Sequence, residues 1–443
     1  MSAYRPYPKY KPSGVEWLGE VPDGWEVKPL KVIATFNDDV LSENFGEDEE
    51  IEYVDIGSVS LETGIECTET FRFGDAPSRA RRRVRDGDVI ASTVRTYLKA
   101  IAPVVAPPAN LIVSTGFAVI RPRNGLDSHF AKFSLQSGYF VDEVISRSTG
   151  VSYPAINASE MAAISLTLPP LPEQHQIASF LDRECGKLDA LQAKQERLIE
   201  LLKEKRQALI SHAVTRGLDP TAKLKPSGIE WLGEVPEHWR VFPAKRVSSI
   251  FVPQRNKPEL NADGDGVCWM TMEQMRAEEI TTTALWVSEQ AARDAGTRIL
   301  KSGAVIASCV GTFGLATINN ADVIINQQLQ AFIPSDQVEA KFLRHCVINS
   351  AGYFDQIGTA ATITYVNQLG FENMPIALPP LAEQRAIVAH LDEKCGKIDE
   401  LKAKAERAIA LLKERRSALI SAAVTGKIDV RDALPSKTEK QTD

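Results

Sequence analysis

Residues 168–215 read LPPLPEQHQIASFLDRECGKLDALQAKQERLIELLKEKRQALISHAVT, and residues 378–425 repeat them as LPPLAEQRAIVAHLDEKCGKIDELKAKAERAIALLKERRSALISAAVT. Roughly two thirds of the aligned positions are identical, which identifies an internal repeat. Apolar residues recur in each copy at steps of three, four and seven, so they form one stripe along a helix. The stripe comprises Ile177, Leu181, Leu188, Leu191, Leu198, Leu202 and Leu209, then Ile387, Leu391, Ile398, Leu401, Ala408, Leu412 and Leu419. Because it continues for about six heptads, each copy predicts a coiled-coil helix of some 40 residues, about 60 Å long.

Both predicted helices have start and stop signals. Pro172 suits the first helical position, and Glu173 favours the positive end of the helix. Gly217 and Gly426 follow the last apolar positions and predict the two ends. We expect the two helices to pack antiparallel, with one variable domain at each end.

The composition is that of an ordinary soluble protein. The chain has 443 residues, 44% of them hydrophobic and 25% charged, with a formal net charge of −7. Its opening, MSAYRPYPKYKPSG, lacks the apolar core of a signal peptide, and no apolar run reaches membrane-spanning length, so we expect a cytoplasmic protein without a membrane partner. Six cysteines are scattered without CxxC spacing, which predicts neither a metal site nor a disulfide framework.

A second repeat precedes each variable region. KPSGVEWLGEVP at residues 11–22 returns as KPSGIEWLGEVP at residues 225–236. Its Pro, Gly and Trp content suggests an ordered loop, with Trp17 and Trp231 as anchors on a domain surface. The chain thus reads loop, variable region and helix twice, which predicts a pseudo-two-fold assembly.

The two variable regions, about 30–167 and 240–377, share a faint pattern. Strand-like runs at 86–92 and 301–308 are followed by second strand signals at 111–120 and 323–333. Helix-like segments at 128–137 and 338–350 come next, and Ser/Thr/Gly-rich loops at 147–153 and 358–365 close each region. Each region therefore predicts an α+β domain, two similar frames that carry different surfaces.

Basic residues gather in the first variable region. An acidic stretch at 43–69 precedes Arg72, Arg79, Arg81, Arg82, Arg83, Arg85, Arg95 and Lys99. Two interpretations stay open: a solvated face balanced by the acidic stretch, or a patch that neutralises DNA phosphates. The second variable region is less basic and offers amide side chains that could pair with adenine edges.

The sequence shows no catalytic machinery. It lacks the G-x-x-x-x-G-K-[ST] cradle for a nucleoside triphosphate, and Val310 to Gly314 carries two glycines without a dinucleotide fingerprint. The six histidines are dispersed, with neither metal-ligand spacing nor a nucleophile partner. We therefore predict no catalytic residue and no metal ligand.

Together, the two helical copies and the repeated SGVEWLGEVP segment resemble the specificity subunit of type I restriction-modification systems, over nearly the whole chain. The resemblance implies two target recognition domains that read the halves of an interrupted, asymmetric double-stranded DNA target in host defence. It also implies docking of two methylation subunits, which bring S-adenosylmethionine, and of restriction subunits, which use ATP with magnesium. This chain itself would bind no cofactor.

On this basis the chain divides into five segments. We expect a first target recognition domain at 1–167, a spacer helix at 168–217, a second domain at 218–377, a spacer helix at 378–426 and a disordered tail at 427–443. The expected DNA-binding residues are Arg95, Tyr97, Lys99, Arg147, Thr149 and Tyr153 in the first domain, and Thr312, Gln327, Thr362, Tyr365 and Asn367 in the second. The basic side chains would position the backbone, and the amides and hydroxyls would read bases.

A rival hypothesis is a coiled-coil adaptor whose variable domains bind proteins rather than DNA. The acidic net charge of −7 favours this rival. The arginine-rich run and the family resemblance oppose it.

If the helices space two readers, half-sites would lie roughly one helical turn, about 34 Å, apart. Inserting one heptad between residues 188 and 209 should then lengthen the gap in the recognised DNA sequence and leave both half-sites unchanged. Methylation-site sequencing would measure the gap, and an unchanged gap would contradict the spacer role.

Overall fold

The computed structural model describes residues 4–42, 44–359 and 364–431. The chain forms two compact units: unit 1 comprises Met1–Gln195 with Arg407–Asp443, and unit 2 comprises Glu196–Glu406. Each unit therefore contains one variable region and one part of each long helix.

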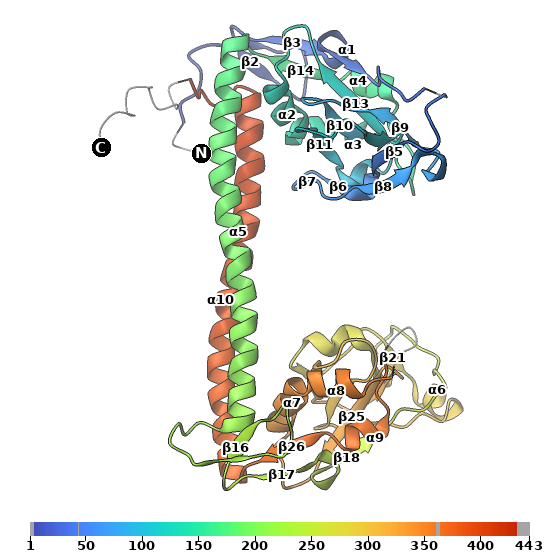
Figure 1. Cartoon of the computed structure of the whole chain (residues 1–443), viewed down its shortest axis with the longest axis vertical. Helices are drawn as coiled ribbons and strands as arrows, with labels where there is room; N and C mark the ends of the chain where they lie inside the picture. The colour runs from blue at the N-terminus through green and yellow to red at the C-terminus, as the bar shows by residue number, and fades with distance from the viewer. Residues whose placement is uncertain (1–3, 43, 360–363, 432–443) are drawn as a thin grey trace. The chain divides into compact units, whose positions relative to one another are not determined.

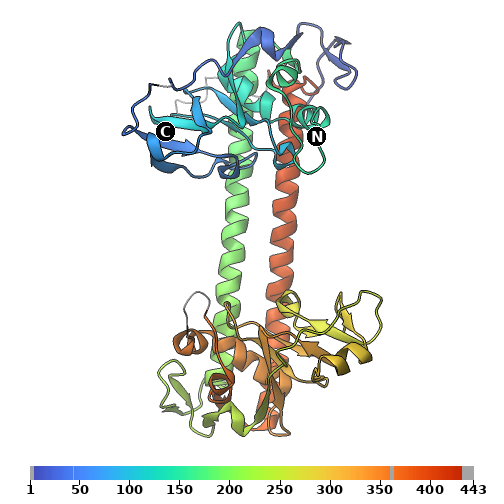
Figure 2. The same ribbon diagram turned by 90° about the vertical axis from the view of Figure 1, so that its right-hand side faces the viewer.

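The predicted helices are present as α5 (Leu171–Arg216) and α10 (Leu381–Val424) (Figure 1). They run antiparallel within each unit. In unit 1 the Arg416 Nε atom lies 3.0 Å from Asp189 Oδ1, and in unit 2 the Arg206 Nε atom lies 3.6 Å from Asp399 Oδ1. In both pairs an early position on one helix meets a late position on the other, and the two ribbons run side by side in Figure 2.

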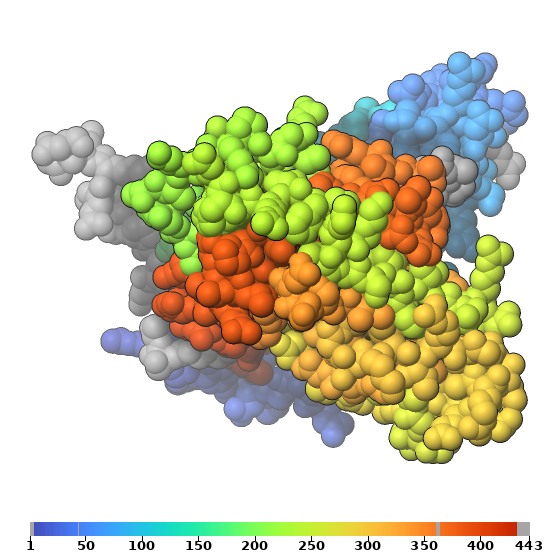
Figure 3. Space-filling model, turned by 90° about the horizontal axis from the view of Figure 1, so that it is seen from below, coloured from blue at the N-terminus to red at the C-terminus, as the bar shows by residue number. Residues whose placement is uncertain are grey.

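Glycine ends both helices as predicted. Gly217 and Gly426 each have φ of 72°, a left-handed conformation that glycine adopts without strain. Each lies against a buried tryptophan, Trp239 in unit 2 and Trp25 in unit 1. In Figure 3 the green segment that includes β15 (Leu224–Pro226) and β16 (Glu234–Pro236) lies against the orange-red start of α10.

The predicted apolar stripe is buried only in part. Ile177, Leu181, Leu188 and Leu202 are buried, whereas Leu191 is 46% exposed. Leu198 and Leu401 are exposed as well, so the stripe is not covered along its whole length. The first positions are covered because Ile177 and Leu181 share a core with the sheet domain of unit 1, while farther along the helix pair covers only a narrow stripe.

Two four-stranded sheets form the domain of unit 1. The first, in the order β11-β10-β13-β4, is antiparallel and consists of Ile101–Pro103, Val89–Ser92, Phe117–Pro122 and Ala34–Phe36. The second, in the order β8-β5-β12-β9, consists of Glu69–Arg72, Glu50–Val54, Leu111–Ser114 and Ala80–Arg83. In it only β5 and β12 are parallel.

Short pairs and helices complete unit 1. The pairs are β1 (Tyr10–Pro12) with β2 (Glu20–Pro22), β3 (Glu26–Pro29) with β14 (Ser165–Leu168), and β6 (Val59–Ser60) with β7 (Gly64–Ile65). The helices are α1 (Leu30–Ile33), α2 (Ser128–Gln136), α3 (Gly138–Ser146) and α4 (Ala158–Ala162).

Unit 2 repeats this plan with variations. Its first sheet, β18-β25-β22-β23-β20, consists of Ser248–Phe251, Leu329–Pro334, Val305–Ser308, Ala316–Asn319 and Glu279–Ile280. Its second sheet, β21-β19-β24, consists of Trp286–Val287, Val267–Met270 and Val323–Ile325, and β19 runs parallel to β24 as β5 does to β12. β17 (Arg240–Pro243) pairs with β26 (Pro375–Leu378), and the helices are α6 (Glu289–Asp294), α7 (Ala340–Asn349), α8 (Ala351–Ile357) and α9 (Gln368–Glu372). The predicted α+β class and internal repeat are confirmed.

The second strand signals were each predicted as one strand, and this is wrong. Residues 111–114 form β12 in the second sheet of unit 1, while residues 117–122 form β13 in the first. At the turn between them, a Cβ on Gly116 would lie 2.6 Å from Ile56 Cδ1, so the end of the Ile56 side chain would have to shift. Residues 323–333 divide in the same way into β24 and β25. Fully buried strands read as continuous apolar runs, so hydrophobic periodicity does not mark their boundary.

The predicted tryptophan anchors are confirmed. The Trp17 ring stacks on Tyr139 of α3 with centroids 5.1 Å apart, and Trp231 lies near Tyr353 of α8 at 6.2 Å. At the other end of the chain, Ile428 and Val430 are buried in the core of unit 1, so the first residues after Gly426 belong to the fold. The rest of the predicted tail, 432–443, lies outside the described residues.

A buried glutamine joins each long helix to its sheet domain. The backbone N–H of Asp127 donates to Gln174 Oε1 at 2.8 Å, and Gln174 Nε2 donates to the carbonyls of Gly125 and Pro169, both at 2.8 Å. Gln384 repeats this arrangement in unit 2, with Glu339 N–H as donor and the Gln337 and Pro379 carbonyls as acceptors. Both glutamines are fully buried. Each therefore satisfies three backbone groups that water does not reach.

Replacing Gln174 by Ala should lower the free energy of unfolding of unit 1 by about 3 kcal/mol, because three buried backbone groups lose their partners. Gln384→Ala should have a similar effect on unit 2. Denaturant unfolding of the full chain measures both variants. The control is Gln195→Ala, a substitution at a half-exposed position later in α5, which should have little effect. Equal stability of all three variants would contradict the proposed role.

Candidate nucleic-acid interface

In unit 1 the structure brings together two loops that the sequence singled out. The loop after β10 and the loop after α3 meet through a bridge between Val94 and Ala155. Ile156 N–H donates to the Thr93 carbonyl at 2.9 Å, and Thr96 Oγ1 donates to Ser148 Oγ at 2.8 Å. The predicted residues at 95–99 and 147–153 thus form one surface, called loop cluster 1.

Arg95 lies beside a cavity in loop cluster 1. Its backbone is left-handed, with φ 51° and ψ 47°, and its guanidinium lies 5.2 Å from the centre of the Tyr153 ring. A cavity of about 460 Å³ beside it is lined by Asp55, Ile56, Gly57, Arg79, Val94, Arg95, Leu98 and Tyr153. Arg95, Tyr97, Lys99 and Tyr153 are all exposed. Cationic and aromatic side chains therefore face solvent together.

Arg147 and Thr149 have partners within unit 1. The Arg147 guanidinium pairs with Glu143 at 2.7 Å, which offsets its charge. Thr149 forms a backbone bridge with Ala155 that holds the second loop in place. Both residues belong to loop cluster 1, but their described contacts are structural.

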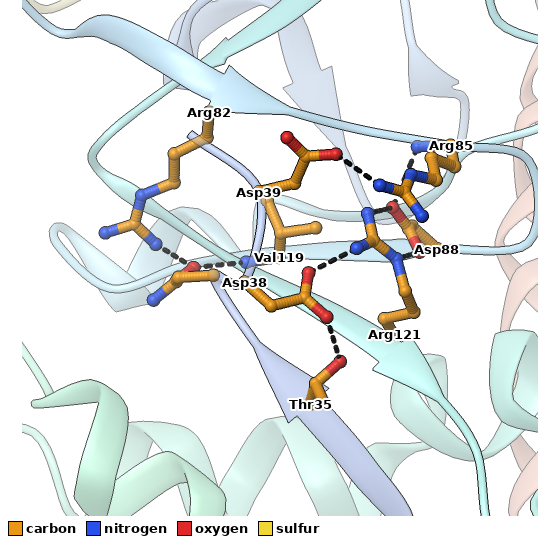
Figure 4. A network of polar contacts seen from close by, with 9 residues as sticks. Thr35, Asp38, Asp39, Arg82, Arg85, Asp88, Val119 and Arg121 are labelled. Carbon is orange, nitrogen blue, oxygen red and sulfur yellow. Dashed lines mark hydrogen bonds and ion pairs between the residues drawn. The ribbon is translucent and has the colours of Figure 1, made fainter. Parts of the chain in front are cut away.

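Arginines of unit 1, including Arg85 of the basic run, already have acidic partners (Figure 4). Arg121 bonds to Asp88 at 2.9 Å through Nε and also pairs with Asp38, while Arg85 pairs with Asp39 at 2.6 Å. The hydrogen bonds to Asp88 raise the pKa of Arg121. Burial alone would raise the pKa of Asp38, but the Thr35 hydrogen bond and the Arg121 charge outweigh it and hold the pKa below its usual value.

Arg82 is also used structurally, because it bonds to the side-chain oxygen of Asn37, which accepts the Val119 N–H at 2.8 Å. Of the eight basic residues in the sequence run, Arg82 and Arg85 therefore already have polar partners within unit 1. Within residues 44–359, by contrast, no ion pair engages Arg79, Arg95 or Lys99. The run therefore contains arginines with partners inside unit 1 and basic residues without an ion pair in that range, and DNA contact by the latter stays a prediction.

Unit 2 builds the equivalent surface, loop cluster 2, from the loop after β22 and residues 364–367. Gly311 N–H donates to the Thr364 carbonyl at 2.9 Å, and Val366 N–H donates to Cys309 at 3.0 Å. Both β10 and β22 read VIAS, so Gly311 occupies the position of Arg95. Its φ is also positive, at 74°. The backbone path is the same, but the side chain is absent.

The predicted residues of unit 2 lie at or near loop cluster 2. Thr312 and Tyr365 are exposed there. Gln327 Nε2 donates to the carbonyls of Gln254 at 3.2 Å and Arg255 at 2.9 Å, and the Asn367 side chain caps α9 by accepting Gly370 N–H at 3.0 Å. Thr362 lies outside the described residues. The two amides thus already have structural partners.

Sequence reasoning missed an acidic residue of the cavity, Asp55, and gave Arg79 no role of its own. Asp55 follows β5 directly and caps the 3-10 helix η1 (Ile56–Ser58). The signal was a carboxylate at the end of an apolar strand, which is also a common helix cap and therefore unspecific.

The described residues offer neither a candidate metal site nor a candidate membrane-spanning helix. Within 4–42, 44–359 and 364–431, no group of three or more His, Cys, Asp or Glu side chains could hold a metal ion. None of the helices in these ranges is both long enough and apolar enough to cross a membrane.

Comparison with known proteins agrees with this arrangement. The family model for the type I restriction modification DNA specificity domain matches residues 22–201 and again residues 236–409. The chain belongs to the type I restriction-modification DNA specificity family. Its two matched segments correspond to the variable regions with the following helical copies.

Individual members of the specificity family match this chain over 65% to 93% of its length. The type I restriction enzyme EcoKI specificity subunit of Escherichia coli K12 is 20% identical over 93% of this chain and 90% of its own length. The MjaVIII specificity subunit of Methanocaldococcus jannaschii is 26% identical over 65% of this chain and 67% of its own. A chain from a solved structure concerning complex assembly and conformational transition of the type I R-M system is similar with a TM-score of 0.71 and 25% identity, covering 91% of this chain and 98% of that one.

These matches confirm the predicted specificity subunit over the rival coiled-coil adaptor. The family's members are specificity subunits, in agreement with the prediction of a recognition subunit rather than a catalytic one. The individual DNA-binding residues stay predictions.

Proposed function

We propose that this chain reads an interrupted, asymmetric double-stranded DNA target in a type I restriction-modification complex, with one half-site for each unit. The repeated match to the specificity domain is the observation that carries the proposal. The two loop clusters have equivalent backbones and different side chains, which is what two readers of different half-sites require. In this proposal the chain itself catalyses nothing.

In unit 1 we assign backbone contacts to Arg95 and Lys99, with Tyr97 and Tyr153 beside them. A left-handed backbone costs about 1 kcal/mol for a residue with a side chain, and glycine avoids this cost. The equivalent position in unit 2 is glycine, so the fold does not need arginine there. Retaining at that cost an exposed guanidinium that has no ion pair within residues 44–359 favours a role in binding the DNA backbone.

In unit 2 we assign the reading surface to loop cluster 2. Thr312 and Tyr365 offer hydroxyls, and Gln327, Asn367 and Thr362 are the further candidates from the sequence. Gln327 and Asn367 also have structural roles, so their substitution would disturb the loops as well as any base contact.

The long helices carry matching exposed leucines that suit two identical partners. In unit 1 Leu191 and Leu411 are 46% and 65% exposed and line a groove of about 730 Å³ with Tyr4, Leu188 and Leu419. The equivalent residues in the repeat, Leu401 and Leu201, belong to unit 2 and are 48% and 45% exposed. We propose that each leucine pair docks one methylation subunit, because exposed apolar patches mark interfaces.

The remaining partners and cofactors follow from this proposal. Restriction subunits would join the complex, S-adenosylmethionine would be held by the methylation subunits, and ATP with magnesium by the restriction subunits. The complex would act on DNA in the cytoplasm, in host defence.

Purified chain mixed with its cognate methylation subunit should form a complex with two methylation subunits per chain, and the complex should methylate adenine in a split motif with a fixed gap. Mass measurement and methylation-site sequencing of unmethylated genomic DNA test both points. Leu191→Asp with Leu411→Asp should reduce the ratio to one methylation subunit, whereas Leu369→Asp, at an exposed leucine of α9, should not. A complex without sequence-selective methylation would refute the proposed function.

Arg95→Gly should leave stability unchanged, because glycine fits the left-handed backbone, yet weaken DNA binding by the complex about tenfold. Losing one phosphate contact should also reduce the slope of log K against log salt by about 0.9. Titrations at several salt concentrations measure both quantities, and Lys99→Ala should behave alike. Arg123→Ala, at an exposed arginine outside loop cluster 1, serves as control. Unchanged affinity and slope would contradict the assignment.

A further inference from the structure

Sheet topology brings a carboxylate and two guanidinium groups to one corner of unit 1. Asp55 follows β5, which runs parallel to β12, and Arg79 precedes β9, which runs antiparallel to β12. Both residues therefore lie at the end of the sheet where β12 finishes. Thr115 N–H donates to the Arg79 carbonyl at 2.8 Å. The Thr93 N–H donates to the Gly116 carbonyl at 2.8 Å, and this bond brings the loop that carries Arg95 to the same corner.

The charged groups at this corner do not neutralise one another. Asp55, Arg79 and Arg95 line the same cavity of about 460 Å³, yet no ion pair joins the carboxylate to either guanidinium in the described part of unit 1. Asp55 Oδ1 accepts the Gly57 N–H, and Arg95 rests on the Tyr153 ring. The remaining carboxylate oxygen and the Arg79 guanidinium are therefore available to a ligand that offers both a donor and acceptors.

The equivalent corner of unit 2 has different chemistry on the same backbone. Thr271 follows β19 and caps the 3-10 helix η5 (Met272–Arg276), as Asp55 follows β5 and caps η1. Gly311 stands where unit 1 has Arg95. A hydroxyl and a glycine thus replace a carboxylate and a guanidinium. The capping role alone explains an oxygen at this position, but it does not require a charge.

We infer that Asp55 and Arg79 read one G·C base pair in the half-site of unit 1. In the major groove, cytosine presents the N4 amino donor and guanine presents the adjacent O6 and N7 acceptors. A carboxylate accepts from the first, and a guanidinium donates to the other two in a bidentate contact. Arg95 would hold the neighbouring phosphate. This inference rests on the proposed function and names two residues that determine its specificity.

The test uses the complex with the methylation subunit and methylation-site sequencing of unmethylated genomic DNA. Asp55→Asn keeps an oxygen for the helix cap but adds an amide donor, so discrimination at one G·C position should fall about tenfold. Arg79→Lys should relax the same base pair, because lysine lacks the bidentate fork. The other half-site should not change in either variant. Asp75→Asn, at an exposed aspartate in the 3-10 helix Phe73–Asp75, is the matched control and should change nothing.

The inference is overturned if neither half-site contains a G·C pair, if Asp55→Asn and Arg79→Lys relax different base pairs, or if both variants keep full discrimination at every position. These outcomes leave the proposed function intact, because the wild-type complex would still methylate a split motif. A wild-type complex without a split motif would overturn the proposed function itself.

Discussion

The structure depends on the antiparallel packing of α5 against α10. Each unit takes its hydrophobic core from both helices, so that the start of one helix and the end of the other lie in the same cluster. In unit 1, Ile177 and Leu181 of α5 share a core with Ile420 and Val424 of α10 and with phenylalanines of α2. In unit 2, Ile210 and Val214 of α5 join Ile387 and Leu391 of α10. Neither variable region completes its core with its own following helix alone.

This constraint explains which residues the two halves share. Residues that join helix to sheet recur at equivalent positions, among them the buried glutamines, the terminal glycines and the tryptophans against which those glycines pack. A buried glutamine with three backbone partners tolerates no substitution without loss of stability. The positions that differ between the two loop clusters do not join a long helix to its sheet domain. Their backbones match, while Arg95 and Gly311, or Asp55 and Thr271, differ in the chemistry they present.

The arginines of unit 1 also divide into two groups, those with acidic partners and those beside a cavity. Charge in sequence does not reveal which guanidinium groups are free, because pairing partners come from distant segments. Arg121 and Arg85 are held by Asp88, Asp38 and Asp39, so these groups stabilise the sheet domain. Arg79 and Arg95 remain beside a cavity. A basic surface formed by a few such arginines is compatible with an acidic net charge of −7.

The sequence by itself determined the internal repeat, the two long helices with their ends, the α+β class and the family, because these rest on local periodicity, on capping residues and on direct similarity between two stretches. It also identified the loops that form the two clusters. The tertiary structure alone decided the separation of the apolar runs 111–120 and 323–333 into strands of different sheets, since buried strands have no polar alternation to mark their ends. It likewise decided which arginines have acidic partners and that Asp55 and Arg79 line one cavity, because strand pairing between residues distant in sequence creates both arrangements.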